Sequence, residues 1–112
     1  MPLRETYNAR RYNELITLTY SEPIVDDYGH KAMTEPIDVL DVYASVRQMS
    51  ASKTMLTFQQ ADVIGLDIEF RKPEARFNGL RYKGHDVVFS QPEAMERGRI
   101  LRLSGYYQID NP

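Results

Sequence analysis

The alternation of apolar and polar residues with a period of two restricts the fold of this chain more than any other feature. Residues 63–71 show it most clearly, with Leu66, Ile68 and Phe70 on one face and polar residues or glycine between them. Successive side chains of a β-strand point to opposite faces of a sheet, so this spacing predicts a strand. The other alternating runs are residues 14–20, 37–49, 80–82, 86–90 and 99–108. The sequence therefore predicts about six strands.

Residues that favour turns separate the predicted strands. Residues 21–36 contain two prolines, an Asp-Asp pair and Gly29, and we predict a loop there. Lys83-Gly84 lies between two short alternating runs, which indicates a tight hairpin in which Gly84 supplies a positive φ angle. Residues 92–98 are predicted to form a second, wider turn. Polar residues at every second strand position favour an antiparallel sheet over a buried parallel one.

One segment departs from the strand pattern. Ser50 can cap a helix, because its hydroxyl can accept a hydrogen bond from a free backbone N–H in the first turn. Ala51, Met55 and Phe58 follow at the i, i+4, i+7 spacing of one helix face. A short helix is therefore predicted over residues 51–60, inserted between two long strands.

Together these elements predict an all-β fold, a small antiparallel β-barrel or sandwich of about six strands with one short inserted helix. We expect residues 14–112 to form a single β-barrel domain, because a chain of 112 residues is long enough to bury one continuous core. Residues 1–13 are polar, carry three arginines and are expected to form an N-terminal arm.

Composition argues against several classes of function. The chain has no cysteine, which rules out disulfides, thiolate metal sites and cysteine nucleophiles. Its formal charge is −2, so it lacks the strongly basic character of a typical nucleic-acid-binding domain. No apolar run approaches the ~20 residues of a membrane-spanning helix, and we expect no membrane partner.

The side chains that could ligate a metal do not form a complete set. Asp26, Asp27 and His30 share one predicted loop. Two carboxylates and one imidazole are too few for a hard-cation loop, which needs more oxygen ligands in a fixed order. We therefore interpret this group as an Asp-rich turn with a surface histidine, and we expect no metal.

Two further pairs carry residue types of acid–base catalysis. His85 and Asp86 are adjacent in a predicted strand, so they point to opposite faces and cannot pair as a triad requires. Glu93 and Glu96 lie in a polar turn, where a carboxyl group lacks the burial that would raise its pKa for acid catalysis. There is no glycine-rich phosphate loop either, and we expect neither enzymatic activity nor a cofactor.

Two features point instead to contacts with other proteins. Arginine outnumbers lysine by ten to four and there are eight tyrosines, and both types are enriched at hot spots of protein interfaces. Residues 48–60 are rich in Ser, Thr, Gln and Met and carry Lys53 as their single charge. We predict either an amphipathic helix packed on the sheet or a mobile loop that orders against a partner.

A series of short segments between residues 10 and 105 carries a family resemblance. They are Arg10-Arg11, Leu15-Ile16-Thr17-Leu18, Asp26-Asp27-Tyr28-Gly29, Val42-Tyr43-Ala44-Ser45-Val46-Arg47, Gln59-Gln60-Ala61-Asp62, Leu66-Asp67-Ile68-Glu69-Phe70-Arg71, Leu80-Arg81-Tyr82-Lys83-Gly84, Asp86-Val87-Val88-Phe89, and Leu101 with Leu103. In this order they resemble the phage head–tail joining family, the small head-closure (stopper or adaptor) proteins of tailed bacteriophages and prophages. The family often has a tryptophan near the second strand, and this chain has none.

The resemblance implies a non-enzymatic virion protein that joins the DNA-filled head to the tail. Such proteins look like small β-barrels that form a homo-oligomeric ring beneath the portal. A portal or adaptor protein then binds one side, a tail protein binds the other, and double-stranded DNA passes through the channel. The expected location is the head–tail interface of the virion, and the host bacterial cytoplasm during assembly.

By the same resemblance, the segment of residues 48–60 is a candidate channel or gating element. Its candidate residues are Lys53, Met55, Phe58, Gln59 and Gln60. The near-neutral charge of the chain would suit a channel through which DNA must pass without sticking, because each Lys or Arg contact to phosphate strengthens binding.

Two other functions stay open at this point. A barrel that binds single-stranded nucleic acid would need a basic groove with stacking aromatic residues, for which Tyr82, Phe89 and Tyr106 are candidates, although the charge balance opposes it. Another phage tail-completion protein would copurify with tails rather than heads. A small enzyme is the least supported of the functions considered.

Overall fold

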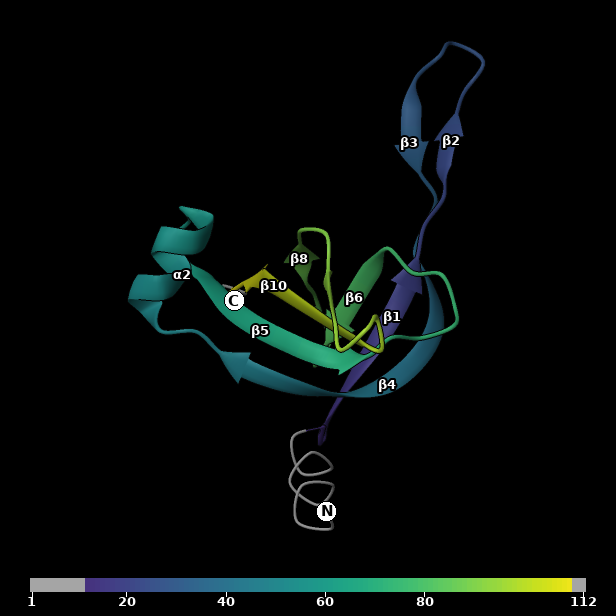
Figure 1. Cartoon of the computed structure of the whole chain (residues 1–112). Coiled ribbons are helices and arrows are strands. Elements are labelled where there is room, and N and C mark those ends of the chain that lie inside the picture. Colours follow the sequence, from purple (N-terminus) through teal and green to yellow (C-terminus); the bar gives the residue numbers. More distant parts are fainter. Residues whose placement is uncertain (1–11, 110–112) are drawn as a thin grey trace.

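The longest predicted strands pair in one strongly curved antiparallel sheet (Figure 1). A computed structural model describes residues 12–109 of the chain. Its strands are β1 (Glu14–Tyr20), β2 (Pro23–Val25), β3 (Lys31–Met33), β4 (Ile37–Gln48), β5 (Val63–Arg71), β6 (Gly79–Tyr82), β7 (His85–Asp86), β8 (Val88–Phe89), β9 (Glu93–Met95) and β10 (Ile100–Gln108). One helix, α2 (Ala51–Phe58), lies between β4 and β5. The chain is therefore all-β with one short inserted helix, as predicted.

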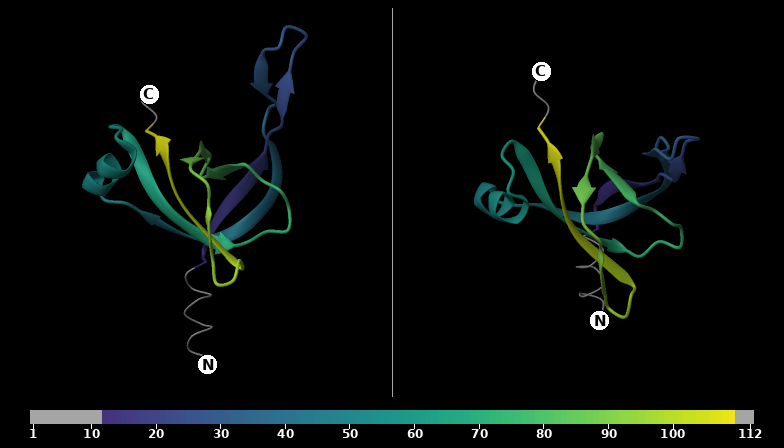
Figure 2. Two further views of the ribbon diagram at one scale, coloured as in Figure 1. Left: turned by 45° about the horizontal axis from the view of Figure 1, so that its top comes forward. Right: turned by 90° about the horizontal axis from the view of Figure 1, so that it is seen from above.

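The sheet curls into a nearly closed barrel. Its strand order is β7-β6-β1-β4-β5-β10-β8, with β9 also paired to β10. Strands β7 and β8 end this order on opposite sides, yet they are separated in the chain only by Val87. Val87 is buried, and its backbone N–H donates to the carbonyl of Leu80 at 2.9 Å. The two ends of the sheet therefore meet, as the views in Figure 2 show.

The barrel interior holds the apolar face of the alternating strands. On β5, Leu66, Ile68 and Phe70 are at most 2% exposed, which confirms the face predicted from their spacing. The predicted hairpin at Lys83-Gly84 is also present, and both of its turn residues have positive φ angles. The core residues are Ile16, Leu18, Ala44, Leu66, Ile68, Phe70, Leu80, Tyr82, Val87, Leu101 and Leu103.

Two segments predicted to be irregular contain strands. Residues 21–36 are not a loop but a hairpin, in which β2 and β3 form a sheet of their own. The predicted turn at residues 92–98 includes β9, which pairs with the start of β10. Both errors have the same cause, because strands of three residues are too short to display a period of two. The predicted return strand at 86–90 is likewise divided into β7 and β8 around Val87.

Helix α2 begins as predicted but buries a different face. The Ser50 hydroxyl accepts a hydrogen bond from the Lys53 backbone N–H at 3.1 Å. The helix ends at Phe58, two residues before the predicted end, because its C-cap Gln59 adopts a left-handed conformation. Its buried residue is Thr54, whereas Ala51 and Met55 of the predicted face are exposed. No helix within residues 12–109 is long and apolar enough to cross a membrane.

Candidate assembly surfaces

The β2–β3 hairpin projects away from the barrel (Figure 1). All six residues of its two strands are exposed, and among the described residues the two strands pair only with each other. The apolar side chains among them stay in solvent, with Ile24, Val25 and Met33 between 50% and 62% exposed. An isolated two-stranded hairpin is at best marginally stable in water, so the exposed apolar side chains of this hairpin make it a candidate contact surface.

A network around Asp26 shapes the tip of the hairpin. One oxygen of the Asp26 carboxylate accepts hydrogen bonds from the backbone N–H groups of Tyr28 (2.9 Å) and His30 (2.8 Å), and the other lies 3.1 Å from the His30 imidazole. These bonds favour the ionised carboxylate. The hydrogen bond from the His30 backbone N–H is the main reason that the pKa of Asp26 lies below its ordinary value. The turn holds Tyr28 outward, with 86% of its surface exposed.

Only the base of the hairpin is attached to the barrel. The Asn78 side chain accepts from the backbone N–H of Ser21 (2.9 Å) and donates to the Ser21 carbonyl (2.7 Å). Across the base of the hairpin, the Thr34 hydroxyl accepts a hydrogen bond from the Glu22 backbone N–H at 2.8 Å, and the Thr34 backbone N–H donates to the Glu22 carbonyl at 2.9 Å. The direction in which the hairpin leaves the barrel is thus set at its base.

The predicted gating residues lie in or just after helix α2, and three of the five contact the barrel strands β5 and β10. The Lys53 ammonium lies 3.1 Å from an Asp67 carboxylate oxygen on β5. The Phe58 ring packs on the Tyr106 ring of β10, with 4.8 Å between centroids, and the Gln60 amide donates to the Tyr106 hydroxyl at 2.8 Å. The two remaining candidates, Met55 and Gln59, are exposed. This segment is therefore a packed helix rather than a loop.

Gly65 allows the helix to sit close to β5. A Cβ atom at this position would lie 2.6 Å from the Thr54 hydroxyl and 2.9 Å from the Met49 sulfur. Thr54 itself is 4% exposed, and its hydroxyl donates to the Ser50 carbonyl at 2.8 Å. The missing side chain at Gly65 leaves the room that Thr54 occupies, which explains why the buried face of the helix runs through Thr54.

Asp67 links the helix to two strands. Its carboxylate accepts from the Ser104 hydroxyl on β10 at 2.8 Å and from the Lys53 ammonium. Burial alone would raise the pKa of Asp67, but the Ser104 and Lys53 hydrogen bonds and the positive charge of Lys53 outweigh it. The pKa of Asp67 therefore lies below its ordinary value, and the carboxylate stays ionised between its partners.

A second exposed region is an apolar groove lined by Tyr12, Val42, Tyr43 and Arg71. Val42 and Tyr43 come from β4, and Arg71 is the last residue of β5. Tyr43 is 65% exposed. The Arg71 side chain is also exposed and makes no hydrogen bond or ion pair with any residue between 12 and 109. The groove therefore combines aromatic walls with a cation that pairs with no residue of the described range 12–109.

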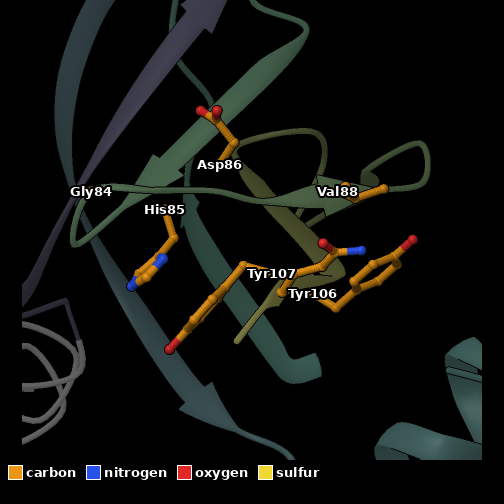
Figure 3. A pocket seen from close by; sticks show the side chains of 7 residues that line it. Gly84, His85, Asp86, Val88, Tyr106 and Tyr107 are labelled. Carbon is orange, nitrogen blue, oxygen red and sulfur yellow. The ribbon is translucent and has the colours of Figure 1, made fainter. Parts of the chain in front are cut away.

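A pocket near the end of β10 brings together His85, Tyr106 and Tyr107 (Figure 3). His85 stacks on Tyr107 with 4.2 Å between ring centroids and a 15° angle between planes. Asp86 points away from His85 in Figure 3, which agrees with the predicted opposite orientation of adjacent strand residues. The aromatic rings of this pocket are thus occupied by contacts with each other or with Phe58.

The remaining acidic and histidine candidates do not assemble into a site. Within residues 12–109, no three His, Asp or Glu side chains are grouped so that they could hold a metal ion. Asp26 and His30 form the turn described above, while the Asp27 carboxylate is exposed beside them. Glu93 and Glu96 are both exposed, on β9 and in the turn that follows it.

The aromatic residues proposed for nucleic-acid stacking are not available as one surface. Tyr82 is 7% exposed and belongs to the core, while Tyr106 packs on Phe58. Phe89 is partly buried against the same core. The sequence alone did not predict the hairpin, because its three-residue strands are too short to show alternation. It did not predict the groove either, because the groove is lined by residues that are distant in the chain.

Comparison with known proteins supports the fold alone. No family model and no curated protein matches the chain. Among solved structures, the solution structure of protein SF1141 from Shigella flexneri 2a, a structural genomics target, is similar to this chain with a TM-score of 0.60 and 18% sequence identity. The match covers 87% of this chain and 93% of SF1141. The two proteins therefore share the arrangement of the barrel over nearly all of their lengths.

Proposed function

We propose that this chain is a non-enzymatic structural protein of a tailed-phage virion, which joins the DNA-filled head to the tail as a member of a ring. Two independent lines support the proposal. The order of short motifs along the chain resembles the head–tail joining family, and the observed small β-barrel is the fold which that resemblance implies. The ring, its portal-side and tail-side partners and its location in the virion all belong to the proposal.

The β2–β3 hairpin is the observation that carries the proposal. A monomeric protein rarely extends an apolar strand pair into solvent, because exposed apolar surface and free strand edges promote association. Here Ile24, Val25, Tyr28 and Met33 are all at least half exposed on one projecting element. This arrangement suits a subunit that is completed by neighbouring proteins.

The candidate gating role of residues 48–60 remains a prediction about a ring. In a single chain, helix α2 is held by Lys53, Phe58 and Gln60, so a gate built from it would move as a packed helix or would first release these contacts. Among the five candidate residues, Met55 and Gln59 are exposed and are not among the three that hold the helix against the barrel, so they could meet DNA or a neighbour in such a ring.

Deleting the gene from an inducible source phage tests the proposal. After induction, electron microscopy of the lysate should show separate heads and free tails, with heads partly or wholly empty of DNA. Normal heads with incomplete tails would instead support a tail-completion protein. Intact infectious particles would contradict both, and a salt-sensitive shift of single-stranded DNA by the purified protein would then favour the nucleic-acid-binding alternative.

The same deletion phage allows a test of the β2–β3 hairpin itself, with a matched control variant. Complementation with the wild-type gene should restore infectious particles, whereas a Tyr28→Ser/Ile24→Ser variant should not. A Val88→Ser variant, altered at an exposed apolar residue of the barrel strand β8 outside both the hairpin and the candidate gating segment, serves as the control. Full complementation by the hairpin variant would remove the hairpin as support for the proposal.

A further inference from the structure

The tip of the hairpin and the apolar groove have complementary chemistry. Segment 21–36 carries four carboxylates and one ammonium, a formal charge of −3 with His30 neutral. At its tip an exposed aromatic ring, Tyr28, is adjacent to the exposed carboxylate of Asp27. The groove offers the counterpart, with aromatic and aliphatic walls beside the cation of Arg71.

The charges available for an external contact are unambiguous. Asp26 already accepts two backbone hydrogen bonds from its own turn and lies 3.1 Å from the His30 imidazole. The Asp27 carboxylate and the Arg71 guanidinium, in contrast, make no hydrogen bond or ion pair with any residue from 12 to 109. An Asp–Arg pair can form two parallel hydrogen bonds, which gives a contact both strength and orientation.

The two surfaces cannot meet within one chain. The groove includes Tyr12, which precedes β1, whereas the hairpin follows the opposite end of β1. The seven residues of β1 alone separate these ends by roughly 23 Å at about 3.3 Å per residue. Figure 1 shows the hairpin on one side of the barrel and the start of β1 on the other. A hairpin bound in a groove must therefore come from another molecule.

We propose that the hairpin tip of one copy of this chain binds in the groove of the next copy, with Tyr28 between Tyr12 and Tyr43 and Asp27 paired with Arg71. Because two different patches meet, the contact is heterologous, and repeating it gives a closed ring or an open filament. Exposed Leu15, which lies opposite Tyr43 in the register of β1 and β4, extends the apolar surface available to the hairpin strands. The inference deepens the proposed function, since it names the contact that would hold the ring.

Directed cross-linking tests which surfaces meet, since the chain has no cysteine of its own. We would place one cysteine beside the tip (Lys31→Cys) in one batch and one beside the groove (Lys72→Cys) in another, with tags of different length. After mixing, a short bis-maleimide should join tip to groove in a product that migrates between the two self-linked forms. The control replaces the groove variant with Ser52→Cys, an exposed position on α2.

Exchange of charges tests the proposed pair without removing the aromatic contact. Asp27→Arg and Arg71→Asp should each lower the yield of tip-to-groove product about tenfold, because each places like charges together. When the Asp27→Arg substitution is on the tip copy and Arg71→Asp on the groove copy, the yield should return to the wild-type level. Glu35→Arg, which makes the same charge change at the base of the hairpin, should leave the yield unchanged.

The outcomes separate this contact from the proposed function. A tip-to-groove product no stronger than the α2 control, a dominant tip-to-tip product, or failure of the charge exchange to restore the yield would each overturn the contact. Those results would leave the deletion phenotype unaffected, so head–tail joining could stand without this contact. Conversely, a specific product together with an infectious deletion phage would keep the contact and overturn the proposed function.

Discussion

Helix α2 and the β2–β3 hairpin both extend from the barrel, but they differ in what holds them. The helix is fastened along its length by Thr54 in the space left by Gly65, by the Lys53–Asp67 ion pair and by Phe58 on Tyr106. The hairpin is tied to the barrel at its base, and its apolar residues contact solvent. Contacts within the chain therefore hold the helix against the barrel, whereas the strands of the hairpin pair with each other and leave their apolar side chains exposed.

Filling the space at Gly65 should break the attachment of the helix most severely. The side chain of Gly65→Val would overlap the Thr54 hydroxyl and the Met49 sulfur, and overpacking of this kind costs about 1–3 kcal/mol of unfolding free energy. Urea denaturation followed by circular dichroism measures the loss. Ala32→Val, the matched addition on the exposed strand β3, should change stability by less than about 0.5 kcal/mol. Equal losses in both variants would contradict the comparison.

Removing the ring of Phe58 should have the next largest effect. Phe58→Ala loses the packing on Tyr106 and should lower the unfolding free energy by about 1–2 kcal/mol, since the ring is only partly buried. Leu56→Ala, at a neighbouring position that is 81% exposed, provides the control and should be nearly neutral. If both variants lose the same amount, Phe58 does not anchor the helix.

The ion pair of Asp67 should give a smaller contribution that depends on pH. Because the folded pKa of Asp67 lies below its ordinary value of 3.8, its stabilising effect is complete above that pH and is lost as the pH falls through the folded pKa. Asp67→Asn should therefore be less stable than the wild type at pH 7, by under about 1 kcal/mol. The difference in unfolding free energy between the two proteins should become smaller as the pH falls. A gap that stays constant down to pH 2 would show that the effect is not due to ionisation.

Substitution at the tip of the hairpin should leave stability nearly unchanged and affect association instead. Tyr28→Ser removes a side chain that touches little of its own chain, so we expect a change of less than about 0.5 kcal/mol in unfolding. Self-association measured by sedimentation should weaken about tenfold, as for an interface anchor. Unfolding at a much lower urea concentration would place Tyr28 in the fold instead.

The sequence predicts the barrel better than it predicts helix α2 and the β2–β3 hairpin, because the patterns that identify the barrel strands are local in the sequence. Alternation over nine residues identified β5, and the glycine in Lys83-Gly84 identified its tight hairpin. The buried face of α2 was missed, because Thr54 is chosen by the absent side chain of Gly65 on a different element. The groove has no local signal at all, since Tyr12, Tyr43 and Arg71 meet only when three strands pair.

The most direct measurement of the difference between the two appendages is a series of ¹H–¹⁵N spectra of the full chain at rising protein concentration. If the hairpin binds a second copy of the chain and the helix does not, the amide signals of Tyr28 and Tyr43 should shift together while those of Lys53 and Thr54 stay fixed. Shifts confined to α2, or no shifts anywhere at concentrations approaching a millimolar, would contradict the account.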